Sequence, residues 1–336
     1  MGLLRAPPGE GSVTVAGGLL VDVHLSEDEL RAALELDVRT GLTASPKHLP
    51  PTWFYDEVGS RLFEQITRLA EYYPTRAERA LLAAHAGDVA AIARADSLVE
   101  LGAGACDKTR LLLDALAAYG PLRSYLPFDV SDEFLRAAAA GVADDYDGLE
   151  VHAVVGDFHR HLDRVPRTGR RLIAFLGGTI GNLVPEERRR FLFDLNCAMT
   201  AGDHLLVGTD LVKDPARILA AYDDDQGVTA AFNRNVLCVL NDQLGANFVP
   251  ERFAHVALWD PDRQWIEMRL RSSCQQSVRI DDLDMTVDFG PTEELRTEIS
   301  AKFTRERVTG ELTEAGFVVD GQWGTEFLLT VAHPLC

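Results

Sequence analysis

Short apolar runs and helical patterns alternate along the middle of the chain. The apolar runs predict strands at 97–101, 125–130, 151–155, 172–176 and 204–211. Helical stretches follow the first, second, fourth and fifth of these runs. Strands that are apolar at nearly every position and alternate with helices are typical of a parallel sheet covered on both faces. The pattern therefore predicts an α/β fold.

Four further features lie before the first of these strands. Residues 26–29 read Ser-Glu-Asp-Glu, a capping box that predicts the start of a helix, and Gly41 is suited to end it. An aromatic segment stiffened by two prolines follows at 49–56, and an Ala-rich helix is expected from about 76 to 94. Residues 1–23 are rich in Gly, Pro and small side chains, so we expect a flexible tail there.

The strand–helix alternation stops after the fifth strand and resumes near the C-terminus. Residues 212–302 do not alternate, whereas 306–315 predict a helix and 317–322 and 327–333 predict two closing strands. We interpret 24–77 plus 212–302 as a substrate-binding lobe, and 78–211 plus 303–336 as the cofactor-binding domain. The lobe is expected over the carboxyl edge of the sheet, where open α/β sheets bind ligands.

The first strand runs into an acidic, glycine-rich turn with Glu100, Gly102 and Gly104. Such a strand–turn–helix places a nucleoside cofactor, because glycine permits a sharp turn and close approach of the backbone. A dinucleotide fingerprint has a third glycine, and this chain has Asp107 there. The Glu100 carboxylate suits a cationic ligand better than a phosphate. The turn therefore favours S-adenosylmethionine (SAM) over a nicotinamide dinucleotide.

Polar residues after the next strands could complete a SAM site. Asp129 ends the second strand, where an acid can accept hydrogen bonds from ribose hydroxyls. Asp157 and Phe158 follow the third strand and could bind the adenine amino group and ring. Lys108 could bind the carboxylate of the methionine part. Each also has an ordinary interpretation: a helix-capping or surface acid, a simple loop and a solvated lysine.

A glycine-rich loop follows the fourth strand and contains Gly177 and Asn182. Its glycines allow the backbone to approach both cofactor and substrate, and the Asn182 amide could direct an amine lone pair toward a methyl group. Alone, such a loop is often only a turn. Cys106 is interpreted as a packing residue, because methyl transfer to an amine needs no nucleophilic cysteine.

Composition excludes several classes of function. The chain has 336 residues and a formal net charge of −19, a surface that disfavours nucleic acid as a partner. No apolar run approaches the roughly 18–20 residues of a membrane span, and we see no signal peptide. The five cysteines are scattered, which is typical of reduced thiols in the cytoplasm. The histidines are scattered too, apart from His159 and His161, so we expect no metal.

Taken together, the chain resembles the histidine-specific N-α-methyltransferases of ergothioneine biosynthesis, from about residue 25 onward. The glycine turn is shared by very many methyltransferases, and the other matching segments are far more specific. The resemblance is carried by residues 50–56, 71–76, 100–110, 175–183, 208–214, 221–223, 229–233 and 298–300.

The resemblance implies a Rossmann-like class I SAM methyltransferase sheet with a second lobe. It implies transfer of three methyl groups from SAM to the α-amine of L-histidine, giving hercynine, by a cytoplasmic enzyme that we expect to be monomeric. The implied SAM-binding positions are Gly102, Lys108, Asp129, Asp157 and Phe158. The implied histidine-binding positions are Tyr55, Gly177 and Asn182 for the amine, Tyr72 and Tyr222 for the carboxylate, Glu298 and Ser300 for the imidazole, and Met268 as a pocket wall. Tyr55 and Asn182 are the implied catalytic residues.

Without the resemblance, several of these residues look ordinary. Tyr72 would pack at a helix end, Tyr222 would lie in a solvated loop, and Glu298 and Ser300 would share the solvent face of a strand. Three other functions stay open: methylation of another small amine or amino acid, SAM-binding regulation without turnover, and nicotinamide-dependent oxidation. The last is disfavoured by Asp107.

Overall fold

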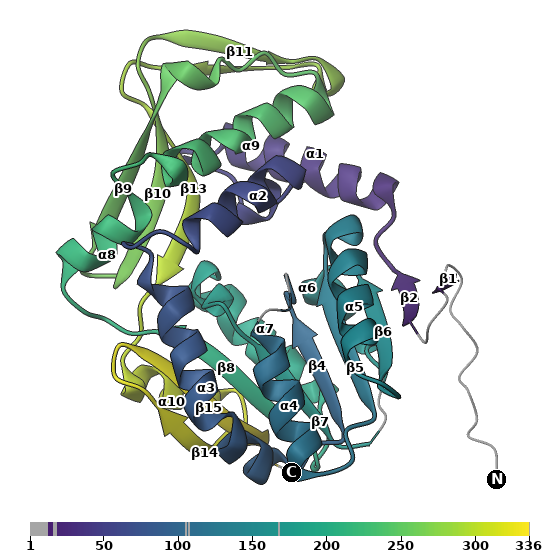
Figure 1. Ribbon diagram of the computed structural model, residues 1–336. Coiled ribbons are helices and arrows are strands. Elements are labelled where there is room, and N and C mark those ends of the chain that lie inside the picture. Colours follow the sequence, from purple (N-terminus) through teal and green to yellow (C-terminus); the bar gives the residue numbers. More distant parts are fainter. Residues whose placement is uncertain (1–12, 16–18, 105, 107, 167–168, 336) are drawn as a thin grey trace.

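The computed structural model describes residues 13–15, 19–104, 106, 108–166 and 169–335. Its largest element is a nine-stranded sheet with the strand order β1-β2-β6-β5-β4-β7-β8-β15-β14 (Figure 1). These strands are β1 (Val13–Val15), β2 (Leu19–Val23), β4 (Ser97–Leu101), β5 (Ser124–Asp129), β6 (Glu150–Val155), β7 (Arg171–Phe175), β8 (His204–Asp210), β14 (Phe317–Trp323) and β15 (Phe327–Pro334).

The pairing in this sheet confirms the predicted α/β, Rossmann-like fold. Strands β2, β6, β5, β4, β7 and β8 run parallel, and β15 pairs antiparallel with both β8 and β14. The chain runs outward from β4 in one direction through β5 and β6, and in the other through β7 and β8. Ligands of open α/β sheets bind where the strand order reverses in this way, outside the carboxyl ends of the strands.

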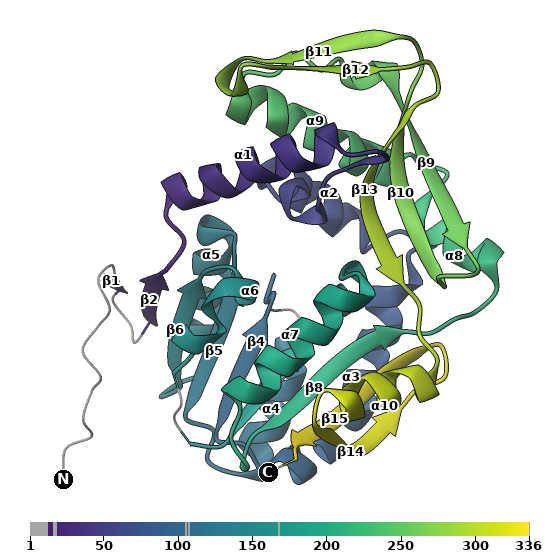
Figure 2. The ribbon, with the colours of Figure 1, turned by 180° about the vertical axis from the view of Figure 1, so that it is seen from behind.

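Helices cover both faces of the sheet (Figures 1 and 2). They are α3 (Tyr73–Ala93), α4 (Thr109–Tyr119), α5 (Asp132–Asp145), α6 (Phe158–His161), α7 (Pro185–Ala198) and α10 (Arg305–Glu314). Successive residues of β4 show that both faces are buried. Leu98 belongs to one apolar core and Val99 to another, and both are at most 1% exposed. This explains the nearly continuous apolar runs in the sequence.

A second body, which we call the upper lobe, lies above the sheet domain in Figures 1 and 2. Its four-stranded sheet has the order β3-β13-β10-β9, and β11 and β12 form a hairpin beside it. The lobe contains α1 (Glu27–Thr43), β3 (Lys47–His48), η1 (Pro51–Phe54), α2 (Glu57–Ile66), α8 (Pro215–Tyr222), α9 (Val228–Leu244), η4 (Pro250–Arg252), β9 (Phe253–Asp260), β10 (Trp265–Ser272), β11 (Gln276–Ile280), η5 (Asp281–Leu283), β12 (Met285–Phe289) and β13 (Glu294–Ala301).

The lobe has its own apolar core, which draws on two separate parts of the chain. The N-terminal part supplies buried residues from Leu34 to Tyr73, and the later part supplies residues from Ile218 to Leu295. Phe54 and Phe232, one from each part, are in ring contact at 4.6 Å. Neither part could bury its apolar face without the other.

Two local expectations about helix α1 have different outcomes. The capping box at its start is confirmed, because Ser26 Oγ accepts from the Glu29 N–H and the Glu29 carboxylate accepts from the Ser26 N–H. Gly41 does not end the helix, which continues to Thr43. A Cβ at Gly41 would lie 1.9 Å from the His48 carbonyl oxygen, so glycine is needed there for the close passage of β3.

The expected tail at 1–23 is wrong for part of its length. Residues 19–23 form β2, which pairs in parallel with β6 and places Val21 opposite Ala153. Leu19 and Val21 are buried, so alternating apolar residues in an otherwise small-residue segment extend the sheet. Residues 1–12 and 16–18 lie outside the described part of the chain. Among the described helices, none has the length and apolar character to cross a membrane.

Candidate active site

One cavity of about 1040 Å³ lies between the carboxyl edge of the main sheet and the upper lobe. All of the site residues predicted from the sequence line it. They are Tyr55, Tyr72, Gly102, Lys108, Asp129, Asp157, Phe158, Gly177, Asn182, Tyr222, Met268, Glu298 and Ser300. Ligand sites for one drug-sized molecule usually occupy about 300–1000 Å³, so this cavity has room for a nucleoside and a small second molecule together.

The glycine turn after β4 forms one wall of the cavity. Gly102 and Gly104 have φ angles of 71° and 53°, in the left-handed region that glycine enters without strain. A Cβ at either position would meet nothing within 4 Å, so the backbone conformation, rather than crowding, requires glycine. Asp107, which replaces the third glycine of a dinucleotide fingerprint, lies outside the described residues.

Asp129 holds the glycine turn from the end of β5. Its carboxylate accepts hydrogen bonds from the Gly104 N–H at 3.2 Å and the Ser131 N–H at 3.1 Å. Burial raises the pKa of Asp129, against the lowering effect of these backbone donors. Ser131, which precedes α5, makes no capping bond with its side chain. Asp129 therefore fixes the turn and also lines the cavity.

Asp157 and Phe158 lie on the same side of the cavity, where β6 passes into α6. The Phe158 ring makes edge contacts with Phe175 at 5.4 Å and Phe191 at 5.5 Å. These contacts join α6 to β7 and α7. Phe158 is thus held by packing at a position where it can border a planar ligand.

Lys108 and Gly177 share a partner that the sequence analysis missed. The buried carboxylate of Glu78, on α3, forms an ion pair with Lys108 Nζ. It also accepts from the Gly177 N–H, at 2.8 Å and 3.0 Å to its two oxygens. Glu78 lies four residues before the buried Leu82, on the same face of α3. An acid on the apolar face of this Ala-rich helix is the feature that could have identified Glu78 from the sequence.

Glu100 serves the protein's own structure. This buried carboxylate accepts from Thr109 Oγ1 at the start of α4 and from Tyr125 Oη at 2.8 Å. Burial raises the pKa of Glu100 to about 7, although both hydrogen bonds lower it. The acid that we assigned to a cationic ligand thus also ties the glycine turn to α4 and β5.

Three tyrosines form the aromatic wall of the upper part of the cavity. The ring of Tyr72 meets Tyr222 at 6.3 Å, and the ring of Tyr55 meets Phe232 at 5.6 Å. Burial raises the pKa of all three hydroxyl groups well above the usual range. They are therefore neutral donors and acceptors at physiological pH.

A buried lysine that the sequence analysis also missed joins the upper lobe to the main sheet. Lys302 Nζ donates to Tyr222 Oη and to Ser300 Oγ, each at 3.0 Å. It also lies 3.0 Å from Asp210, at the end of β8. Its signal was the alternation of Glu298, Ser300 and Lys302, which places three polar residues on one side of an extended segment.

Glu298 differs from the other buried acids of the site. It lies on β13 opposite Met268 of β10 and is 8% exposed. Among the described residues, none forms a hydrogen bond or ion pair with its carboxyl group. Burial raises its pKa to about 7, while the nearby Lys302 charge lowers it. Its carboxyl group is therefore available to a ligand.

Asn182 closes the loop after β7, at the end of a single 3₁₀ turn (Thr179–Asn182). Within the described chain its side-chain amide has no hydrogen-bond partner. The loop approaches β13 closely, since a Cβ at Gly181 would lie 2.9 Å from the Ala301 carbonyl oxygen. This contact places Asn182 at the junction of the two parts of the cavity.

Comparison with known proteins agrees with this geometry. Residues 34–331 match the family model described as histidine-specific methyltransferase, SAM-dependent. The chain is 53% identical to the histidine N-alpha-methyltransferase of Mycolicibacterium smegmatis, covering 89% of this chain and 94% of that one. It is 55% identical to the enzyme of the same name from Mycobacterium tuberculosis, covering 87% and 91%. Ergothioneine biosynthesis protein 1 of Neurospora crassa is 34% identical over 65% of this chain and 26% of its own.

The resemblance inferred from the sequence is confirmed by these matches, which span both the main sheet and the upper lobe. A SAM-dependent enzyme is also consistent with the glycine turn and the acids at the carboxyl edge of the sheet. The chain belongs to the family of histidine-specific, SAM-dependent methyltransferases.

Proposed function

We propose that this enzyme transfers three methyl groups from SAM to the α-amine of L-histidine, forming N-α-trimethylhistidine (hercynine), the first step of ergothioneine biosynthesis. The observation that carries the proposal is the unpaired carboxyl group of Glu298, in the same cavity as the glycine turn. A buried acid beside a serine hydroxyl is suited to an imidazole, which has one nitrogen that donates and one that accepts. Relatives named histidine N-alpha-methyltransferase at 53% and 55% identity support it.

We assign the lower part of the cavity to SAM, whose sulfonium supplies an electrophilic methyl group. The Asp129 carboxylate is assigned to accept hydrogen bonds from the ribose hydroxyls. It has lone pairs for them beyond those that accept from the Gly104 and Ser131 N–H groups. Asp157 is assigned to accept a hydrogen bond from the adenine amino group, and Phe158 is assigned to pack beside the adenine ring. The domain assignment is that 78–211 plus 303–336 bind SAM and also bring Gly177 and Asn182 to the amine, and that 24–77 plus 212–302 bind the rest of the amino acid.

Lys108 and the turn at Gly102 are assigned to the methionine part of SAM. Lys108 has three N–H donors, and Glu78 engages its ammonium group from one side. The remaining donors can meet a carboxylate in the cavity. Glu78 thus fixes the position of Lys108 and still leaves N–H donors of its ammonium group for a ligand.

The amino acid's amine is assigned to the junction of the two parts, near Tyr55, Gly177 and Asn182. Glu78 uses the Gly177 N–H, whereas no described residue donates a hydrogen bond to the Gly177 carbonyl, which can therefore accept from an amine N–H. The Asn182 amide and the neutral Tyr55 hydroxyl can form further hydrogen bonds to the amine. Together these contacts orient its lone pair toward the methyl group of SAM. Holding the reacting atoms about 3–3.5 Å apart is then the main catalytic contribution of these residues.

Proton loss has to precede each transfer, because an ammonium group has no lone pair. Burial keeps Tyr55 neutral, so its hydroxyl can relay a proton only by accepting one from the ammonium group while it donates its own hydrogen to solvent water in the cavity, which carries the proton away. After the third transfer, the quaternary nitrogen donates no hydrogen bond to Tyr55, Asn182 or the Gly177 carbonyl. Loss of those contacts favours product release.

The other two groups of histidine have matching partners in the upper lobe. Tyr72 and Tyr222 are assigned to the carboxylate. Tyr72 is the hydrogen-bond donor of this pair, whereas Tyr222 donates its hydrogen to Ser300 and borders the carboxylate with the positive charge of Lys302 behind it. Glu298 and Ser300 are assigned to the imidazole, with Met268 as a wall of its pocket. A site that hydrogen-bonds a substrate group can reject analogues without that group by about 10⁴-fold.

The test is an assay of the full chain with SAM and each free amino acid, with products resolved by mass. We expect histidine to be the preferred substrate and its trimethylated form to be the end product. Preference for another amino acid would move the assignment to the alternative, a SAM-dependent methyltransferase of another small amine. An end product with one or two methyl groups would contradict trimethylation, and SAM binding without turnover would favour a regulatory protein.

A further inference from the structure

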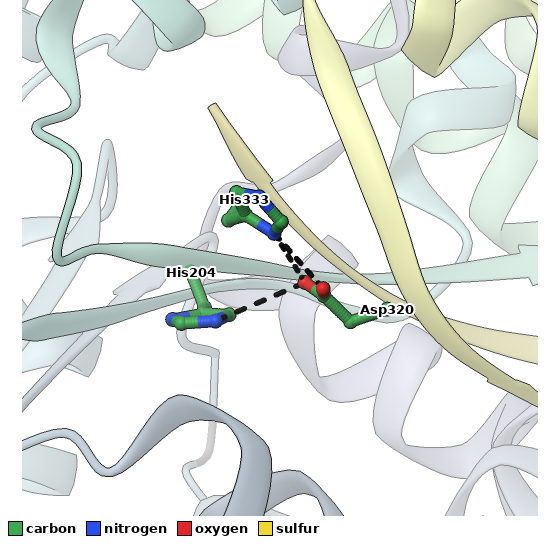
Figure 3. Close-up of side chains that lie close together, drawn as sticks. All are labelled: His204, Asp320 and His333. Carbon is green, nitrogen blue, oxygen red and sulfur yellow. Dashed lines mark hydrogen bonds and ion pairs between the residues drawn. The ribbon is translucent and has the colours of Figure 1, made fainter. Parts of the chain in front are cut away.

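Two histidines and an aspartate meet on three neighbouring strands at the end of the sheet that carries the starts of the parallel strands. His204 begins β8, His333 lies near the end of β15, and Asp320 lies on β14. One ligand atom from each lies within 4.8 Å of the other two. Figure 3 shows the three side chains pointing toward one another. None of them lines the large cavity.

The strand register explains how residues so far apart in sequence come together. Leu205 of β8 opposes Ala332 of β15, so His204 and His333 are the adjacent residues on these antiparallel strands. The pairing of β14 with β15 shifts between Val319 and Gly321, and this β-bulge contains Asp320. A bulge adds one residue and redirects its side chain, which here points toward the two imidazoles.

The three side chains satisfy one another only in part. His333 Nδ1 lies 2.8 Å and 2.9 Å from the two Asp320 oxygens. His204 Nε2 lies 3.8 Å from the nearer Asp320 oxygen, which is too long for a hydrogen bond. Nε2 is the His204 nitrogen that faces Asp320, and it forms no hydrogen bond with a described residue. The cluster therefore has an open ligand position at this nitrogen.

We propose that His204, Asp320 and His333 bind one divalent transition-metal ion of the zinc class, with water completing the coordination. Two imidazoles and one carboxylate are ligands of Zn²⁺ and its neighbours, whereas Mg²⁺ and Ca²⁺ prefer oxygen ligands. Tetrahedral ligands at 2.0–2.1 Å from zinc lie about 3.4 Å apart. Side-chain rotations can bring the present separations, from 2.8 Å to at most 4.8 Å, to that value.

The charges around the site are compatible with a cation. The Asp320 carboxylate supplies negative charge within the cluster, where it lies against both imidazoles. Asp203 adds negative charge nearby and Arg170 opposes it, while Asp320 belongs to the site itself. Arg171 largely compensates Asp203 through an ion pair of 2.6 Å.

The position of the site indicates a structural role. It would connect the β14–β15 hairpin to β8, away from the cavity assigned to methyl transfer. The expectation that the protein holds no metal came from the spacing of histidines along the chain. The fold instead assembles the site from residues on three strands. The proposal is independent of the substrate, so it stands or falls separately from the proposed function.

The test is a calorimetric titration of the chelator-treated full chain with Zn²⁺ alone. We expect one ion per chain, and an affinity at least about 100-fold weaker in the Asp320→Asn and His333→Gln variants. The matched control is His152→Gln, which removes another histidine paired with an aspartate, Asp22, at 2.7 Å. It should bind zinc as the parent chain does.

Two outcomes would overturn the proposal: no saturable binding by the parent chain, or unchanged affinity in both site variants. Circular dichroism before titration shows whether each variant is folded. Co²⁺ gives a second measurement that does not depend on activity, since its visible spectrum reports coordination by protein ligands. We expect that spectrum in the parent chain and in His152→Gln, and its loss in Asp320→Asn.

Discussion

Tyr222 donates a hydrogen bond of 2.8 Å to Ser300, joining the end of α8 to β13 inside the cavity. Lys302 donates to the same serine oxygen at 3.0 Å. Both acceptor positions of Ser300 are therefore used, and its own hydroxyl hydrogen is left to donate. Beside it, Glu298 can accept. This pair is complementary to a neutral imidazole, which offers one acceptor nitrogen and one N–H.

Removing the acid of this pair should affect the amino acid and leave SAM bound. In Glu298→Ala, the affinity for histidine should fall by about 10- to 150-fold. This is the loss expected when one hydrogen bond to a charged group is removed. Calorimetry with histidine and with SAM measures both. Glu314→Gln, an exposed acid at the end of α10, is the control. Unchanged histidine affinity in Glu298→Ala would refute the imidazole assignment.

Lys302→Met removes the cation that connects Tyr222, Ser300 and Asp210. Asp210 is buried, and Lys302 together with Lys213 holds its pKa low against the effect of burial. We expect a loss of about 3 kcal/mol in the free energy of unfolding, typical of breaking a buried ion pair. Urea denaturation measures it. The exposed Arg279→Met, which breaks the pair with Asp281, should change stability by less than about 1 kcal/mol.

Gly208→Ala tests the position of Glu78. A Cβ at Gly208 would lie 2.2 Å from Glu78 Oε1, so alanine should displace the carboxylate that holds Lys108 and Gly177. We expect weaker SAM binding and a stability loss of about 1–3 kcal/mol from overpacking. Gly87→Ala is the matched control, because a Cβ on that α3 residue meets nothing within 4 Å. It should stabilise the protein by about 0.5–1 kcal/mol.

Glu100 predicts a pH dependence of stability. Burial raises its pKa from 4.5 to about 7, so its contribution is complete below pH 4.5 and is lost as the pH rises through 7. Glu100→Gln keeps an oxygen acceptor for Thr109 and Tyr125 but does not titrate. The parent chain should lose up to about 3 kcal/mol relative to this variant between pH 4.5 and 8. If the parent chain and Glu100→Gln differ in free energy of unfolding by the same amount at both pH values, the raised pKa of Glu100 is contradicted.

Asn182→Ala should lower the rate of methyl transfer with little change in SAM affinity. The amide lies at the junction of the two halves of the cavity, where a small misplacement of the reacting atoms costs about 100-fold in rate. Single-turnover measurements with bound SAM separate this step from product release. If the single-turnover rate is unchanged, Asn182 does not position the amine.

The sequence predicted the main sheet well because its parallel strands are buried on both faces and read as apolar runs. It also predicted that Asp129, Asp157 and Asn182 would come together, since the carboxyl ends of parallel strands share an edge. Glu78 was missed because no sequence pattern shows where a helix before the first strand will cross the sheet. The cluster at His204 was missed because it depends on antiparallel register and on the bulge at Asp320.

The mixed origin of the upper lobe's core has a consequence for recombination and engineering. That core is built from residues 34–73 and 218–295, which lie on either side of most of the main sheet in sequence. No contiguous stretch of the gene therefore encodes the part of the protein that is to choose the substrate. Exchanging this lobe between relatives would require two coordinated replacements, matched across the Phe54–Phe232 contact. A single crossover would pair half of one core with half of another.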